Sequence, residues 1–148
     1  MAVDFPSFDT SNFSTNSYLR IVKKPWGQEM HLVPEGLPYM MKIICINPGA
    51  RLSLQSHDEK KESWALLEGP GKVIWQNSSG EMIETVMELG VGYTCAVGQK
   101  HRLAAGSYGS VRILETSTEE LGITKRWEDD YARPDETPAQ RAIERRGM

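Results

Sequence analysis

Polar side chains able to bind a metal recur between Gly49 and Trp64. Side chains along a β-strand alternate between the two faces of a sheet. If this stretch forms a strand, leucines occupy one face and four polar residues share the other. The polar set is Arg51, Ser53, Gln55 and His57. Glu62 follows just before Trp64. This pattern indicates the lining of a polar cavity.

The polar row contains groups that bind divalent metals. Imidazole and carboxylate groups suit zinc, iron, nickel or manganese, and an amide oxygen can fill a further position. Gln55, His57 and Glu62 supply these groups. His101 lies on a later apolar segment and can return to the same place in a barrel. Alternatively, His57 and Glu62 form only a hydrogen-bonding pair at a strand turn. His31 is predicted not to be a ligand.

The elements that must position these residues are short strands. From Leu19 onward, short apolar segments alternate with turns rich in Gly, Pro and Ser, a pattern typical of a β-sandwich or barrel. The predicted strands are Leu19–Lys23, Tyr39–Ile46, Leu52–Gln55, Ser63–Leu67, Val73–Gln76, Met82–Met87, Tyr93–Val97, His101–Ala104 and Val111–Glu115. Near the end, Thr137 can cap a short helix over Pro138–Arg146. The arginines of this tail are expected to be solvated or frayed.

Length and pattern predict one domain in 148 residues. We expect an N-terminal arm over residues 1–18, a folded domain over residues 19–133, and a tail or short helix over residues 134–148. The arm is interpreted as a disordered leader, or as a segment that packs on a neighbouring subunit through Phe5, Phe8 and Phe13. Exposed aromatic rings favour association, so a homodimer is expected.

Charge and hydropathy exclude several classes of protein. A net charge of −3 argues against a general nucleic-acid binder. No apolar run approaches the roughly 20 residues of a membrane-spanning helix. The N-terminus lacks the features of a secretory signal. Cys45 and Cys95 lie in apolar segments, which favours reduced, buried thiols in a cytoplasmic protein, although a disulfide between them stays open.

The motifs resemble those of the cupin superfamily. Gly49 begins a first motif in which Gln55 replaces the usual first histidine, and Gly90 begins a second that ends at His101. The Gln variant is similar to the cupin domain of type II phosphomannose isomerases, which also occur fused to mannose-1-phosphate guanylyltransferases. Five anchors in the right order carry this resemblance: Pro25-Trp26-Gly27, Ser53–His57, Glu62–Trp64, His101-Arg102 and Asp129–Arg133. They span about residues 19–133.

The resemblance implies an all-β, cupin-type double-stranded β-helix (a jelly-roll barrel) with a short C-terminal helix. It implies one divalent metal, most simply zinc, on four ligands. These are Gln55, His57, Glu62 and His101. It further implies catalytic roles for Arg133 and Glu115. Lys42, Arg51 and Lys60 are the expected substrate-binding cations, since phosphate anchors are cationic.

Structural roles are the alternative for three of these residues. Lys42 could extend from a strand edge to solvent, Glu115 could pair with Arg51, and Arg133 could be an exposed tail residue. The chain also departs from the isomerase pattern. Lys60 stands where Arg is usual, Ser63 where His is usual, residues 121–124 replace an acidic run, and Ala132 replaces Gly.

These features predict a metal-dependent sugar-phosphate isomerase, most simply one that converts mannose 6-phosphate to fructose 6-phosphate. The alternative is a non-catalytic metal-containing cupin that binds a sugar phosphate or sugar nucleotide. An iron-dependent cupin oxygenase is a third possibility, but such enzymes usually have more histidines. The expected partner is a small sugar phosphate, with no nucleic-acid or membrane partner.

Overall fold

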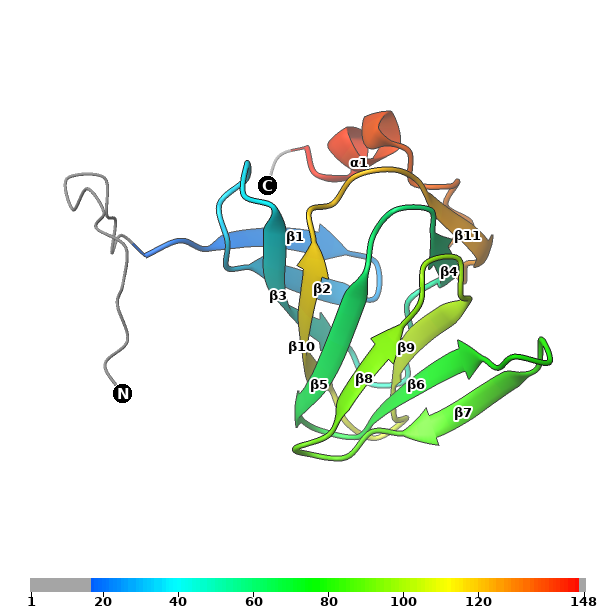
Figure 1. Ribbon diagram of the computed structural model, residues 1–148. Helices are drawn as coiled ribbons and strands as arrows, with labels where there is room; N and C mark the ends of the chain where they lie inside the picture. Colours follow the sequence, from blue (N-terminus) through cyan, green and yellow to red (C-terminus); the bar gives the residue numbers. More distant parts are fainter. Residues whose placement is uncertain (1–16, 147–148) are drawn as a thin grey trace, which may run out of the picture.

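The structure, a computed structural model, describes residues 17–146. The described chain forms strands and one short helix (Figure 1). The strands are β1 (Arg20–Lys24), β2 (Gly27–His31), β3 (Tyr39–Ile46), β4 (Leu54–His57), β5 (Glu62–Glu68), β6 (Gly71–Gln76), β7 (Met82–Val86), β8 (Gly92–Cys95), β9 (His101–Ala105), β10 (Val111–Thr118) and β11 (Thr124–Glu128). The helix is α1 (Pro138–Glu144).

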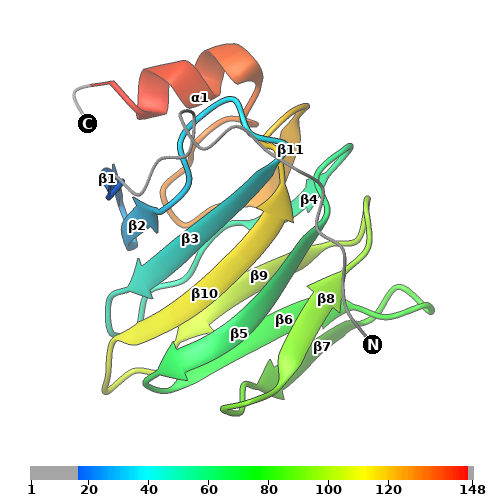
Figure 2. The same cartoon turned by 60° about the vertical axis from the view of Figure 1, so that its left-hand side comes forward.

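The strands form two sheets that face each other (Figure 2). One sheet has the order β1-β2-β3-β10-β5-β8, and the other has the order β11-β4-β9-β6-β7. Strands that are distant in sequence are neighbours, as where β10 lies between β3 and β5. This arrangement confirms the expected jelly-roll barrel with a short C-terminal helix.

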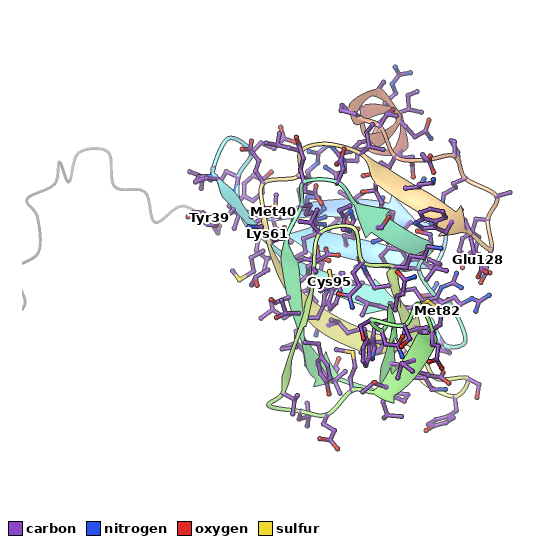
Figure 3. All side chains as sticks on the ribbon, turned by 45° about the vertical axis from the view of Figure 1, so that its right-hand side comes forward. Tyr39, Met40, Lys61, Met82, Cys95 and Glu128 are labelled. Atoms are coloured by element: carbon purple, nitrogen blue, oxygen red, sulfur yellow. The ribbon has the colours of Figure 1, made fainter. Side chains whose placement is uncertain are left out.

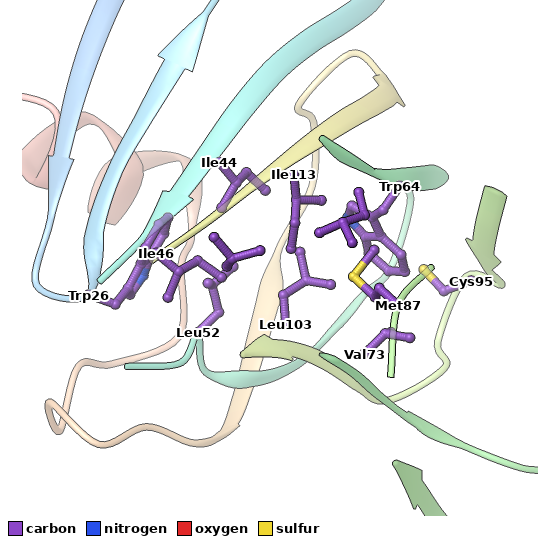
Figure 4. Close-up of a cluster of buried hydrophobic side chains, with 12 residues drawn as sticks. Trp26, Ile44, Ile46, Leu52, Trp64, Val73, Met87, Cys95, Leu103 and Ile113 are labelled. Carbon is purple, nitrogen blue, oxygen red and sulfur yellow. The ribbon is translucent and has the colours of Figure 1, made fainter. Parts of the chain in front are cut away.

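The core fills the space between the sheets (Figure 4). Its buried side chains come from both sheets and include Trp26, Ile44, Ile46, Trp64, Leu103 and Ile113. β3 illustrates the alternation that builds this core, because every second side chain from Met40 to Ile46 is buried. Lys42 occupies one of these inward positions, so a charged group enters the barrel, where it pairs with the carboxylates of Glu29 and Glu120.

The predicted strands are present, with shifted bounds. The segment predicted as Leu52–Gln55 forms a strand only from Leu54 to His57, and β10 continues beyond Glu115 to Thr118. Two strands were missed. β2 and β11 are largely polar in sequence, and the packing of their neighbours, rather than hydrophobic alternation, makes them strands.

The C-terminal helix is capped as predicted, with Thr137 Oγ1 accepting a 3.1 Å hydrogen bond from the backbone N–H of Gln140. The prediction that its arginines are solvated or frayed is wrong for two of them. Arg141 donates to the carbonyls of Glu120 and Gly122, and Arg145 pairs with the Glu120 carboxylate. These bonds hold α1 over one end of the barrel (Figure 1).

Nearly all of the predicted N-terminal arm, including its phenylalanines, lies outside the described residues. Among the described residues, no helix is long and apolar enough to cross a membrane. Cys45 and Cys95 are both free thiols, so no disulfide joins them. Cys95 is buried, whereas Cys45 is only partly buried, so the expectation of buried thiols is met fully by Cys95 alone.

Candidate metal centre and adjoining cavity

The candidate metal ligands come from both sheets. His57 ends β4, and His101 begins β9 in the same sheet. Glu62 begins β5 of the facing sheet, after a short connection from His57. Strand ends and a tight connection therefore bring ligands from distant parts of the sequence to one place inside the barrel.

Three of the four predicted ligands form a compact, buried cluster. Glu62 Oε1 lies 2.8 Å from His57 Nε2 and 2.6 Å from His101 Nε2. Ligand atoms of these three residues all lie within 4.8 Å of one another. Each residue is at most 5 % exposed. Two imidazoles and a carboxylate at this spacing can hold one divalent ion.

The histidines are oriented by bonds made at their outer nitrogens. His101 Nδ1 donates to the Gln99 carbonyl at 2.9 Å, and His57 Nδ1 lies 2.9 Å from the Thr124 hydroxyl. Both Nε2 atoms therefore face Glu62. His101 Nε2 is buried without a hydrogen bond of proper geometry, although Glu62 is close. Metal-binding histidines typically have this outer support, so the residues fit a metal.

Electrostatics favour a cation in the cluster. Burial lowers the pKa of His57, which favours the neutral, ligating form. Burial acts to raise the pKa of Glu62, but Lys60 and the two histidines hold it well below its ordinary value. Burial also acts to lower the pKa of His101, but interactions with Cys95 and Glu62 raise it to about 10. The carboxylate is thus ionised, and without an ion His101 is protonated beside it, so a metal that binds there displaces the Nε2 proton of His101.

Gln55 completes the predicted ligand set from the cavity side. It lies on β4, two residues before His57, and is partly buried. Its Oε1 accepts a 2.8 Å hydrogen bond from the Ser53 hydroxyl, which fixes the direction of the amide. Gln55 and His57 both line a cavity that opens beside the metal cluster.

This cavity is small and strongly charged. Its volume is about 50 Å³. Its charged lining residues are Lys24, Glu29, Lys42, Lys60, Glu115, Glu120, Arg126, Arg133, Glu136 and Arg145. Cationic side chains outnumber carboxylates in this lining. The cavity therefore suits an anionic ligand that replaces some of the internal ion pairs.

Glu115 and two lysines form the part of the cavity wall nearest the metal cluster. Lys60 Nζ lies 3.0 Å from Glu62 Oε2 and 3.4 Å from Glu115 Oε2, so it links the cluster to Glu115. Trp64 Nε1 donates to Glu115 Oε1 at 3.0 Å. Lys42 pairs with Glu29, at 3.2 Å, and with Glu120. The alternatives of a solvent-facing Lys42 and a Glu115–Arg51 pair are not what the structure shows.

The buried charged residues of this cavity wall shift one another's pKa values. Burial raises the pKa of Glu115 to about 7, with Lys60 acting in the opposite direction. Burial acts to lower the pKa values of Lys60 and Lys42, but the surrounding carboxylates raise both. The lysines are therefore charged, and Glu115 is a carboxyl group that exchanges a proton near neutral pH.

Arg133 and Arg51 have different surroundings. Arg133 lines the cavity and its guanidinium makes two hydrogen bonds to Asp129, at 2.8 and 2.9 Å, so it is no exposed tail residue. Arg51 was expected to face inward, and this is wrong: its side chain is 43 % exposed and pairs with Asp130. Arg51 precedes β4, forms an isolated β-bridge with Ala104, and is not among the cavity-lining residues.

Sequence reasoning missed several residues of the cavity wall. Arg126 lies on the unpredicted strand β11, and Arg145 follows the helix whose arginines were expected to be solvated. Each has a buried Nε without a hydrogen-bond partner. Glu29 lies on the unpredicted β2 and bonds His31, 2.8 Å away, which agrees with His31 being no ligand. Arg126 is a basic residue on a polar strand, and nothing in the sequence around it indicated that its side chain faces the cavity.

The two-sheet barrel and its His-Glu-His cluster define a cupin. A family model described as "Mannose-6-phosphate isomerase C-terminal" matches residues 11–133, and the chain belongs to this family. It is 31% identical over 122 residues to alginate biosynthesis protein AlgA of Pseudomonas aeruginosa, covering 80% of this chain and 24% of that protein. It is 31% identical over 123 residues to xanthan biosynthesis protein XanB of Xanthomonas campestris, covering 81% and 25%. The chain thus spans about a quarter of these relatives.

Solved structures share the fold at low sequence identity. Capsular polysaccharide assembling protein CapF of Staphylococcus aureus superposes with a TM-score of 0.60 at 14% identity, covering 87% of this chain and 33% of that chain. Oxalate decarboxylase OxdC of Bacillus subtilis gives a TM-score of 0.57 at 16% identity, covering 80% and 30%. At these identities the likeness concerns the fold alone.

Proposed function

We propose that the protein is a metal-dependent sugar-phosphate isomerase, most simply one that interconverts mannose 6-phosphate and fructose 6-phosphate. One observation carries the proposal: a single lysine, Lys60, joins the buried His-Glu-His cluster to a buried carboxyl group, Glu115, on the wall of a cation-rich cavity. Membership of the mannose-6-phosphate isomerase C-terminal family supports the same reaction.

The metal in this proposal is zinc, held by Gln55, His57, Glu62 and His101. Imidazole nitrogens are good ligands for zinc, and the amide of Gln55 is the weakest of the four donors. When bound, the ion supplies Lewis-acid stabilisation of negative charge on a substrate oxygen. The outer bonds from Gln99 and Thr124 keep both imidazoles turned toward the ion position.

Glu115 is the proposed proton-transfer group. Interconversion of an aldose and a ketose moves a proton between adjacent carbons, and a carboxyl group with a pKa near the working pH is suited to that task. The Trp64 indole holds Oε1 of Glu115, and Lys60 lies against Oε2. A substrate that attracts Lys60 would free Oε2 to accept and return the proton.

The cations of the cavity are the proposed phosphate anchors. Arg133, Arg126 and Arg145 lie on the wall together with Lys42. An arginine fork can make paired hydrogen bonds to phosphate oxygens. In the described structure these cations pair with carboxylates such as Glu120 and Glu144. A phosphate would replace some of these pairs when it enters.

The test is an isomerase assay on mannose 6-phosphate, run with elemental analysis of the purified protein and followed by a panel of other hexose and pentose phosphates. Turnover that depends on bound zinc is expected. If no sugar phosphate is isomerised by the zinc-loaded protein, the enzymatic proposal is wrong. Glu115→Gln is the matched variant, because it keeps the side-chain shape and removes the titrating group.

A second candidate is a non-catalytic metal-containing cupin that binds a sugar phosphate or sugar nucleotide. The small volume of the cavity, about 50 Å³, and the pairing of its cations with carboxylates favour it. A rise in melting temperature with mannose 6-phosphate or a sugar nucleotide, without turnover, would support this role.

We also propose a homodimer as the working assembly.

A further inference from the structure

Cys95 lies directly against the metal cluster. It ends β8, where it sits opposite Glu62 in the antiparallel pairing of β5 with β8. Its Sγ is 3.8 Å from Glu62 Oε1, the atom that both histidines face. His101 Nε2, which faces the same carboxylate, is buried without a hydrogen-bond partner among the described residues. The sulfur therefore adjoins Glu62, although it lies outside the compact group of ligand atoms formed by His57, Glu62 and His101.

The thiol approaches the cluster from a different side than Gln55 does. Gln55 and His57 line the charged cavity, whereas Cys95 lines a separate cavity of about 310 Å³ with Trp64, Trp75 and Tyr93. Cys95, labelled in Figure 3, is buried and belongs to the core, and Figure 4 shows it near Trp64 and Met87. The side of the cluster away from the charged cavity is therefore occupied by sulfur.

The separation of the two donor atoms matches shared coordination. Zinc–sulfur and zinc–oxygen bonds of about 2.3 and 2.1 Å place the two atoms roughly 3.6 Å apart when the bonds meet at about 109°. The observed 3.8 Å differs from this by a few tenths of an ångström. Cys95 and Glu62 can thus bind the same ion once the Cys95 side chain moves toward the group formed by His57, Glu62 and His101.

Simple packing of a small apolar side chain is the competing explanation for Cys95. A thiol that only donates a hydrogen bond to Glu62 Oε1 is a second competing explanation, and the cobalt spectrum separates it from coordination. Cys45 provides a comparison within the chain. It is partly buried on β3, opposite Gln28 and Arg112, and lines a surface groove with Ser110.

We propose that Cys95 is a further ligand of the metal, which rests on the metal centre of the proposed function. On binding, the S–H bond breaks, the proton leaves to solvent, and the sulfur forms a bond to the ion. Thiolate and Glu62 together neutralise the two charges of a divalent ion. Because thiolates are soft ligands, this donor set favours zinc or cobalt over manganese or magnesium.

The test uses cobalt as a spectroscopic substitute for zinc in the full chain. Cobalt-loaded wild-type protein is expected to show visible ligand-field bands and a near-ultraviolet thiolate-to-cobalt charge-transfer band. Cys95→Ser should lose the charge-transfer band, retain ligand-field bands, and bind zinc at least about tenfold more weakly. Cys45→Ser, the matched control, should retain both sets of bands.

The outcomes separate this inference from the metal centre itself. Ligand-field bands without the charge-transfer band in the wild type, or a band that survives in Cys95→Ser, would overturn the role of Cys95 and leave the centre standing. A protein that takes up no cobalt would refute both. If Cys95→Ser does not fold, X-ray absorption of zinc-loaded wild type decides: a sulfur shell at about 2.3 Å is expected, and nitrogen and oxygen alone would overturn the inference.

Discussion

Gln55 and His101 lie directly opposite each other where β4 pairs with β9. The backbone pairing of the two strands thereby holds an amide and an imidazole side by side at the edge of the charged cavity. Glu62 reaches the same point from the facing sheet. The positions of the donors are therefore set by the barrel, so removing one donor should leave the others in place.

Metal content should respond differently to each ligand. His57→Ala or His101→Ala is expected to abolish zinc binding, because each removes a strong nitrogen ligand. Gln55→Ala should weaken binding less, since an amide oxygen is the poorest donor of the set. Elemental analysis after reconstitution measures this, with circular dichroism as the control for folding. Full metal content in folded His57→Ala would contradict the proposed centre.

Arg133 should affect turnover without affecting the metal. Arg133→Ala is expected to lower kcat/KM by about 10²–10³-fold, as when a charge-stabilising donor is removed, with zinc content unchanged. Arg51→Ala is the matched control, because Arg51 is exposed and pairs with Asp130. Steady-state kinetics with parallel metal analysis make the measurement. Equal losses in both variants would show that the cavity position of Arg133 carries no special role.

Glu136 should contribute stability that disappears in acid. Burial acts to raise its pKa, but Lys24 and Arg141 hold it below the ordinary value of 4.5. A folded-state pKa below the unfolded one gives stability that is fully present above pH 4.5 and lost as the pH falls through the folded value. Glu136→Gln should lower the free energy of unfolding at neutral pH by about 3 kcal/mol.

The Glu136→Gln variant should also lose less stability on acidification than the wild type. Urea unfolding at neutral pH and at about pH 4 gives both quantities. Parallel losses in the two proteins would show that Glu136 does not contribute to the acid sensitivity.

Ala132 stands at a left-handed backbone position, with φ of 53°. For a residue with a Cβ this conformation costs about 1–2 kcal/mol, and glycine adds about 0.4–1 kcal/mol of freedom to the unfolded chain. Ala132→Gly is therefore expected to stabilise the protein by roughly 0.5–1 kcal/mol. Ala142→Gly, within α1, should instead destabilise it by about 1 kcal/mol. Thermal or urea unfolding of both variants tests the pair.

The proposed dimer is tested by sedimentation velocity at micromolar concentration. We expect a dimer for the full chain, and a shift toward monomer when Phe5, Phe8 and Phe13 are all replaced by Ser, since fewer apolar rings would be buried on association. A wild-type protein that sediments as a monomer at high concentration would contradict the proposal.

The order of the strands in the two sheets was not predicted from the sequence, whereas most of the individual strands were. Apolar segments such as Tyr39–Ile46 predict strands through hydrophobic residues at inward positions. Thr137 followed by Pro138 predicts the start of a helix. The four metal ligands were proposed from residue type together with the resemblance to cupin motifs, because strand alternation alone groups only Gln55 and His57 on one face. Strands β2 and β11 were missed because their polar sequences lack that alternation.

Only the tertiary structure decided which charged residues face inward. Arg51 and Arg133 look alike in sequence, but Arg51 pairs with Asp130 at the surface, while the pair with Asp129 holds Arg133 on the cavity wall. The sequence predicts Cys95 to be a buried core thiol. Its position beside Glu62 depends on the pairing of β5 with β8. Contacts between strands distant in sequence depend on register and packing, which no local pattern in this chain encodes.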